Sequence, residues 1–219
     1  MRAVTIDLLA KPMAVPEHRT SMTASPRSLI VAIPAYLEDL VLALDQIDAS
    51  ARGLVRNLTE GQFHWQPLGG RSWSVAQCIE HLTVTNSLYV TAIRQAVDDA
   101  ERHRMAPSTT VKLGLWARFF VWNMEPPPKL KLRARAQITS NPKRTRGELW
   151  LAFTHAEERV RRLMIESAGI DVNRTRFANP LLPGTRFSIG VGFMIVLAHN
   201  RRHLWQAQRV CEAPGFAAA

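Results

Sequence analysis

The stretch 190–210, GVGFMIVLAHNRRHLWQAQRV, has the hydrophobic periodicity of an amphipathic helix. Six residues recur at steps of three and four and therefore share one face, namely Ile195, Val196, His199, His203, Gln206 and Val210. The two histidines are four residues apart, which stacks their rings one helical turn above each other. Because this face is apolar above and below them, we expect both imidazoles to point into the protein.

A buried pair of imidazoles needs polar partners, because an unpaired buried polar group costs about 1–3 kcal/mol. A divalent metal ion is one such partner, and histidines at positions i and i+4 have a spacing that suits it. The alternative is a pair of core histidines that are hydrogen-bonded to carboxylates or carbonyl groups. The spacing by itself leaves both interpretations open.

The composition is that of an ordinary globular chain: 219 residues, 47% of them hydrophobic and 21% charged, which predicts one sizeable core. No apolar run approaches the roughly 18–20 residues that span a bilayer. Asp7 and Lys11 interrupt the apolar residues near the N-terminus, which argues against a signal peptide. The two cysteines, Cys78 and Cys211, make no disulfide framework. We therefore expect a cytoplasmic protein.

The net charge of +10 raises the question of a nucleic-acid partner. The densest basic stretch, 129–146, contains Lys129, Lys131, Arg133, Arg135, Lys143, Arg144 and Arg146. It lacks the regular aromatic interleaving of a surface that stacks bases. A solvated basic loop is favoured, and nucleic-acid binding is not.

Four segments have the pattern of long amphipathic helices. The first covers about 34–58, and the second begins at the capping box Ser74–Gln77 and runs to about 104. The third begins at a second capping box, Thr145–Glu148, and stops near Gly169. The fourth is the histidine-bearing stretch, with Ser188 as its expected cap. These patterns predict an all-α fold in which one bundle domain covers residues 28–219.

The remaining segments show no sustained period. Residues 1–27 carry three prolines and are predicted to be an N-terminal arm. Residues 61–70, 105–144 and 179–185 are predicted to be loops, and no credible set of strands is present.

The connection of about forty residues between the second and third helices can cross the whole bundle, so these two helices can run parallel. His81 lies on the inward face of the second helix, roughly 11 Å from its start. His203 and His199 lie roughly 14–20 Å from the end of the fourth helix. Antiparallel second and fourth helices bring these levels together. The lengths therefore favour an up-down-down-up bundle with a cluster of three histidines.

Three motifs in this order resemble the DinB-like superfamily, which includes the YfiT-type proteins: FHWQP at 63–67, RSWSVAQCIEHL at 71–82 and HNRRHLWQAQRV at 199–210. The resemblance covers about residues 35–212, and the superfamily is related to thiol-dependent transferases and mycothiol-dependent maleylpyruvate isomerases. It implies an up-down-down-up four-helix bundle, often a homodimer. It also implies a divalent metal ion, nickel or zinc, at the positions of His81, His199 and His203.

Three neutral imidazoles would leave coordination positions open on such an ion. The HNRRH stretch lacks the glutamate base of His-Glu-x-x-His proteases, and Glu80 points about 100° away from His81 on a helix. Arg201 and Arg202 could bind an anionic substrate, although a solvated face is favoured for both. Cys78 could be a fourth ligand, although a small core residue is favoured.

These observations favour a metal-dependent enzyme that transfers a low-molecular-weight thiol to a small-molecule substrate. The alternatives are a metal-dependent hydrolase of a small substrate, a metal-binding bundle with a stress-related role and no turnover, and a basic binding module. The last rests on the stretch 129–146 alone.

An aromatic segment, VKLGLWARFFVWN at 111–123, is predicted to be a short helix inside the long connection. Trp116, Phe119, Phe120 and Trp122 are more apolar surface than one short segment normally leaves in water. We expect them to be buried, either on the bundle or in a homodimer contact. A helix lying on a membrane surface is a less favoured interpretation.

Overall fold

Four long helices dominate the part of the chain that the computed structural model describes, which comprises residues 33–103, 106–127, 129 and 144–218. They are α1 (Ala35–Val55), α3 (Val75–His103), α5 (Arg146–Glu166) and α6 (Ile189–Cys211). The predicted arm, residues 1–27, lies outside the described residues, and so does most of the basic stretch 129–146.

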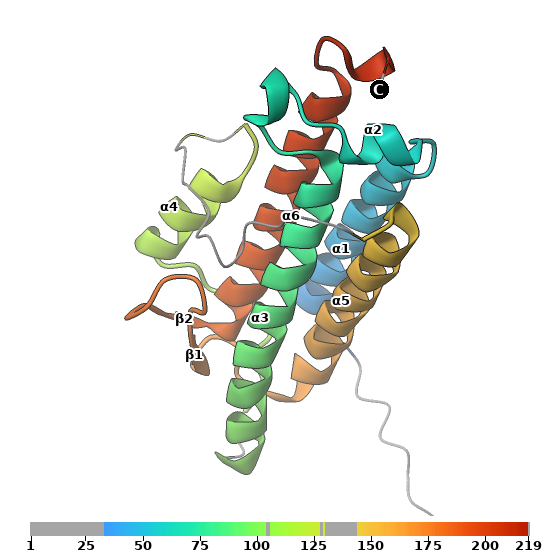
Figure 1. Cartoon of the computed structure of the whole chain (residues 1–219). Coiled ribbons are helices and arrows are strands. Elements are labelled where there is room, and N and C mark those ends of the chain that lie inside the picture. The colour runs from blue at the N-terminus through green and yellow to red at the C-terminus, as the bar shows by residue number, and fades with distance from the viewer. Residues whose placement is uncertain (1–32, 104–105, 128, 130–143, 219) are drawn as a thin grey trace, which may run out of the picture. The chain divides into compact units, whose positions relative to one another are not determined.

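The long helices follow the predicted up-down-down-up order (Figure 1). α1 and α6 run in one direction, whereas α3 and α5 run in the other. α3 packs against α5 and α6, and α1 packs against the same two helices. The core between them includes Phe63, Phe153, Phe177 and Phe193, which are all fully buried. The predicted all-α fold class is confirmed.

Two of the predicted helix starts are confirmed by their capping hydrogen bonds. Gln77 N donates to Ser74 Oγ at 3.1 Å, and Ser74 N donates back to Gln77 Oε1 at 2.8 Å. Thr145 and Glu148 form the same reciprocal pair at the start of α5. Ser188 does precede α6, but its side chain makes no capping hydrogen bond, so that part of the prediction is wrong.

The segment predicted as a loop at 61–70 contains helical turns. It includes most of α2 (Glu60–His64), whose capping box is formed by Thr59 and Gln62, and a 3₁₀ turn at Leu68–Gly70. A helix of five residues is too short to produce a hydrophobic period, so the pattern of the sequence does not predict it.

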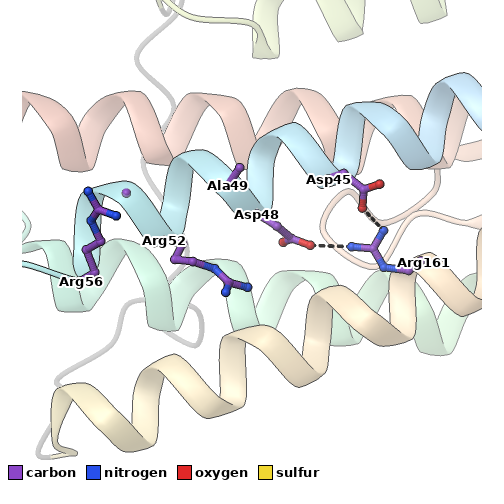
Figure 2. Close-up of a pocket in the computed structure, with 7 residues that line it drawn as sticks. Asp45, Asp48, Ala49, Arg52, Arg56 and Arg161 are labelled. Atoms are coloured by element: carbon purple, nitrogen blue, oxygen red, sulfur yellow. Dashed lines mark hydrogen bonds and ion pairs between the residues drawn. The ribbon is translucent and has the colours of Figure 1, made fainter.

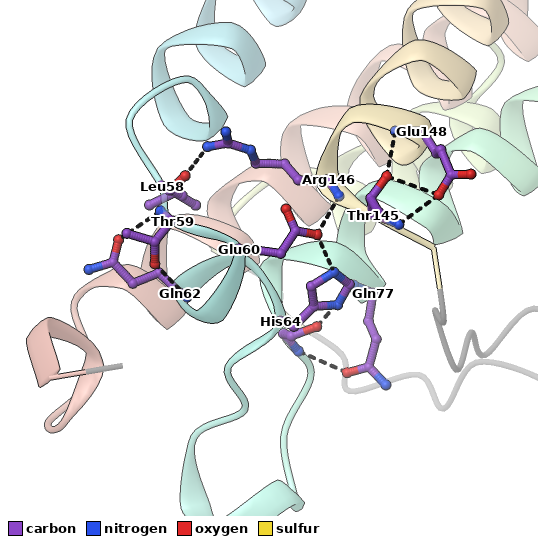
Figure 3. Close-up of polar contacts among 10 residues, drawn as sticks. Leu58, Thr59, Glu60, Gln62, His64, Gln77, Thr145, Arg146 and Glu148 are labelled. Atoms are coloured by element: carbon purple, nitrogen blue, oxygen red, sulfur yellow. Dashed lines mark hydrogen bonds and ion pairs between the residues drawn. The ribbon is translucent and has the colours of Figure 1, made fainter.

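α2 and the turn before it are attached to the start of α5 by a pair of polar contacts (Figure 3). The backbone N–H of Arg146 donates to Glu60 Oε1 at 2.7 Å, and the Arg146 side chain donates to the carbonyl oxygen of Leu58. These contacts close the end of the bundle at which α1 ends and α5 begins.

The connection between α5 and α6 contains a small hairpin that the sequence did not predict. β1 (Arg176–Ala178) pairs antiparallel with β2 (Arg186–Ser188), with Phe177 opposite Phe187. Three-residue strands are too short for an alternating pattern to be recognised. Gly192 on α6 accommodates the hairpin, because a Cβ there would lie 2.6 Å from a ring atom of Phe177.

α4 (Leu115–Met124) lies in the long connection and packs beside α6 (Figure 1). Ala117 and Val121 are buried, and Phe120 is partly buried against the core. In contrast, Trp116, Phe119 and Trp122 are exposed by 65%, 50% and 54%. Their predicted burial on the bundle is therefore wrong, and burial in a homodimer contact stays a prediction.

None of the described helices combines the length and the apolar character that crossing a bilayer would need.

Candidate metal centre

The three histidines predicted to form a cluster converge between α3 and α6. The Nε2 atoms of His81 and His199 are 3.3 Å apart. The ring centroids of His81 and His203 are 4.4 Å apart, and those of His199 and His203 are 4.5 Å apart. One nitrogen from each ring lies within 4.8 Å of the other two. The predicted convergence of these rings is confirmed.

The antiparallel order of the two helices produces this convergence. His81 lies on the second turn of α3, while His199 and His203 lie two to three turns before the end of α6. Since the end of α6 lies beside the start of α3 (Figure 1), all three residues reach the same level of the bundle. Parallel helices would have separated those levels by about 10 Å.

All three rings are buried, with exposed fractions of 3% for His81, 7% for His199 and 9% for His203. Burial, together with the charges of His81 and Arg202, lowers the pKa of His199 from 6.5 to about 3. Burial and the neighbouring His199 and His81 also lower the pKa of His203 well below its ordinary value. His199 and His203 are therefore neutral at neutral pH and keep a nitrogen lone pair available to an ion.

The nitrogen positions fit a divalent metal ion. Two nitrogens bound at about 2.0–2.1 Å to one ion at a tetrahedral angle lie about 3.3 Å apart. His81 and His199 have this separation, 3.3 Å, between their Nε2 atoms. In addition, Nδ1 of His203 is buried and has no hydrogen-bond partner among the described residues. Among those residues, the candidate ligand atoms in this cluster come from the three imidazoles alone.

Trp73 covers the cluster and was missed as a site residue in the sequence. Its ring meets the edge of His81 at a centroid distance of 5.0 Å and stacks on His203 at 5.6 Å and 21°. The available signal was its position directly before Ser74, the cap of α3, which places a large ring at the start of the helix that carries His81.

Gln66 holds the loop that carries Trp73. Its Nε2 donates to the carbonyl oxygen of Ser72 at 3.0 Å and to Gln77 Oε1 at 2.8 Å. Gln77 also accepts from the backbone of Ser74. The residues on both sides of Trp73 are thus fixed to the first turn of α3, which orients the indole over the histidines.

The other residues considered from the sequence lie outside the cluster. Cys78 is fully buried in the core, and burial raises the pKa of its thiol far above the ordinary value. Glu80 is not among the clustered ligand atoms. Arg201 forms a two-pronged ion pair with Glu125 after α4, and Arg202 donates to the carbonyl oxygen of Asn123. The favoured interpretation of a merely solvated arginine pair is therefore wrong.

A second buried polar cluster joins α3, α5 and α6 and was also missed. Glu157 Oε1 accepts from Asn86 Nδ2 at 2.5 Å and from Asn200 Nδ2 at 2.8 Å. Asn86 Nδ2 also donates to Asn200 Oδ1 at 3.1 Å. The pKa of Glu157 is raised to about 8, because burial and the charge of Asp48 outweigh the opposing hydrogen bonds from the asparagines and the charge of Arg161.

A cavity of about 460 Å³ lies on the other side of the bundle, between α1 and α5 (Figure 2). Its charged groups are partly neutralised, because Arg161 is ion-paired with Asp45 and Asp48. None of the three histidines lines it. The cluster of three buried histidines, in which one ring nitrogen has no partner among the described residues, is therefore the better candidate for a functional site.

The fold and the site define a class of protein: a helical bundle with a buried histidine cluster between its second and fourth long helices. A family model described as the DinB superfamily matches residues 43–207, which is most of the chain. The chain belongs to the DinB superfamily.

The chain is also similar in structure to YfiT from Bacillus subtilis, with a TM-score of 0.51 and 11% sequence identity. The alignment covers 90% of this chain and 93% of YfiT, which is described as a probable metal-dependent hydrolase with an unusual four-helix bundle topology. At this identity the likeness shows the fold alone. No curated protein matched the sequence.

Proposed function

We propose that this protein is a metal-dependent enzyme that transfers a low-molecular-weight thiol to a small electrophilic substrate. The observation that carries the proposal is the set of three buried imidazoles, with Nε2 atoms of His81 and His199 at 3.3 Å and an unpartnered Nδ1 on His203. These residues would hold a divalent ion, nickel or zinc. Membership of the DinB superfamily, which is related to thiol-dependent transferases, supports this assignment.

A divalent ion bound by neutral imidazoles keeps its full positive charge and lowers the pKa of a coordinated thiol or water. The protein supplies the surroundings of that chemistry. Trp73 shields the histidines from water on one side, since its ring contacts both His81 and His203. Cys78 does not compete as a nucleophile, because burial keeps its thiol protonated.

The thiol reaction is favoured over hydrolysis by the absence of a carboxylate from the cluster, among the described residues. Hydrolysis needs a base near the attacking water, whereas a coordinated thiol is deprotonated by the ion. The description of YfiT as a probable metal-dependent hydrolase nevertheless favours hydrolysis of a small substrate as the second candidate.

The test begins with metal analysis of protein purified without a histidine tag. Thiol consumption is then measured with glutathione, bacillithiol or mycothiol against a panel of small electrophiles. We expect His203→Ala to abolish both metal binding and thiol consumption. His155→Ala, which changes an exposed histidine on α5, is the matched control and should retain both.

Cys78→Ala should retain most of the activity, because the proposal assigns no role to a protein thiol. Activity that survives His203→Ala, or that is lost in a folded Cys78→Ala protein, would contradict the mechanism. Metal binding with ester or amide hydrolysis but no thiol consumption would favour the hydrolase. Metal binding without either reaction would favour the stress-related bundle without turnover.

A further inference from the structure

The outer face of α4 is apolar although it is exposed. Leu115, Trp116, Phe119 and Trp122 are exposed by 85%, 65%, 50% and 54%. On a helix these four residues lie within one half of the circumference. The opposite half, with the buried Ala117, faces the bundle. α4 is thus apolar on both faces, and only one of them is needed for packing on α6.

The three exposed rings form one continuous surface. Together with Leu115 on the same side of the helix, we name it the α4 aromatic face (Leu115, Trp116, Phe119 and Trp122). The centroids of Trp116 and Phe119 are 5.9 Å apart, and those of Phe119 and Trp122 are 6.2 Å apart. Single exposed apolar residues are normal, whereas a contiguous exposed patch marks an interaction surface.

The rim of the α4 aromatic face is basic. Arg118 on α4 and Lys112 just before it are exposed, and the ammonium group of Lys129 lies 5.1 Å from the centre of the Trp122 ring. Glu125 is the one acidic residue in the sequence from 106 to 129, and Arg201 neutralises it. The partner of this face should therefore combine an apolar layer with negative charge.

We infer that the α4 aromatic face docks on an anionic lipid surface. Tryptophan rings favour the boundary between headgroups and acyl chains, because they have an apolar body and a polar N–H. Basic side chains beside such rings are attracted to anionic headgroups. The helix would lie in the plane of the surface without crossing it. This inference is independent of the proposed reaction.

A second copy of the chain fits the same face less well. A two-fold interface brings identical patches together, so that the basic rim of one protomer meets the basic rim of the other. Arg118 and Lys129 would approach positive charges across the contact, which opposes association. An anionic bilayer presents the complementary charge.

The experiment is co-sedimentation of the full-length protein with vesicles of phosphatidylcholine alone or mixed with phosphatidylglycerol. We expect partitioning to the mixed vesicles to be at least about tenfold stronger and to weaken with added salt. Trp116→Ser/Trp122→Ser should weaken partitioning to the mixed vesicles by about tenfold or more. The matched control is Leu42→Ser/Leu151→Ser, which changes two leucines, each 56% exposed, on α1 and α5.

The charge-reversal variant Arg118→Glu/Lys129→Glu should remove the preference for phosphatidylglycerol while the far-ultraviolet circular dichroism stays unchanged. The inference is overturned if the wild type does not sediment with mixed vesicles at low ionic strength. It is also overturned if Trp116→Ser/Trp122→Ser binds the mixed vesicles as well as the control Leu42→Ser/Leu151→Ser does. A wild-type dimer that becomes monomeric in Trp116→Ser/Trp122→Ser, without vesicle binding, would identify a second copy as the occupant.

Discussion

The three histidines and the Asn86–Glu157–Asn200 cluster are both buried polar groups supported by α3 and α6, yet their polar atoms are satisfied differently. In the second cluster both amide nitrogens reach acceptors across three helices: Asn86 Nδ2 donates to Glu157 and Asn200, and Asn200 Nδ2 donates to Glu157. Its leftover atoms, Asn86 Oδ1 and Glu157 Oε2, are oxygens without a partner among the described residues. The histidine rings contact one another and Trp73, while Nδ1 of His203 has no hydrogen-bond partner among the described residues.

This difference separates two uses of buried polarity. A cluster whose donors meet acceptors on other helices fixes the relative positions of those helices. Each neutral imidazole offers one nitrogen lone pair, and three such nitrogens close together can be satisfied at once by a single cation. We therefore assign a structural role to the asparagine–glutamate cluster and propose ligand binding for the histidines.

The largest expected effect is on metal affinity. His199→Ala removes one of three candidate ligands and should weaken binding of zinc or nickel by more than about 100-fold, measured by isothermal titration calorimetry. The metal should raise the Tm of the wild type and leave that of the variant almost unchanged. His155→Ala is the control for the loss of a histidine elsewhere. Equal metal affinity in the wild type and His199→Ala would show that the three histidines do not form the metal site.

The next effect separates the two clusters by stability. Asn200→Ala deprives the buried Glu157 carboxyl of one hydrogen bond and should lower the free energy of unfolding by about 1–3 kcal/mol in urea titrations. Metal affinity should change by less than about tenfold, because Asn200 is not among the clustered ligand atoms. A loss of affinity as large as that of His199→Ala would mean that the two clusters act as one site.

A third effect concerns pH. The pKa of Glu157 is about 8 in the folded protein, against 4.5 for an ordinary glutamate, so the native state binds the extra proton between these values. Its contribution to stability is complete below about pH 4.5 and is lost as the pH rises through about 8. Glu157→Gln should remove most of this fall in stability, which is on the order of 5 kcal/mol in total, in urea titrations across that range. An unchanged slope would show that Glu157 titrates normally.

The smallest effect is expected at the ring that covers the histidines. Trp73→Phe keeps an aromatic contact with His81 and His203 and should reduce metal affinity by about two- to tenfold, less than the roughly 10–100-fold typical when a group that orients a ligand is lost. Trp205→Phe, which changes a 37% exposed ring on α6, is the control in the same titration. A larger loss of metal affinity than that of His199→Ala would show that Trp73 does more for metal binding than cover the histidines.

The sequence by itself determined the features that depend on local spacing. A period of 3.6 residues defined the four long helices, and i,i+4 spacing put His199 and His203 on one face of α6. Reciprocal hydrogen bonds between residues three apart determined where α3 and α5 begin. The lengths of the connections predicted in addition that α3 and α6 run antiparallel, which brings His81 to His199 and His203.

Only the tertiary structure decided which side of α4 is covered, because both of its sides are apolar and a pattern cannot say which one meets α6. The same holds for Glu157, a charged residue whose burial depends on Asn86 and Asn200 arriving from two other helices. α2 is five residues long and each strand of the β1–β2 hairpin is three residues long, which is too short for any period. Contacts between distant segments fix these features, since their free energy comes from packing and hydrogen bonds that do not exist until the helices are assembled.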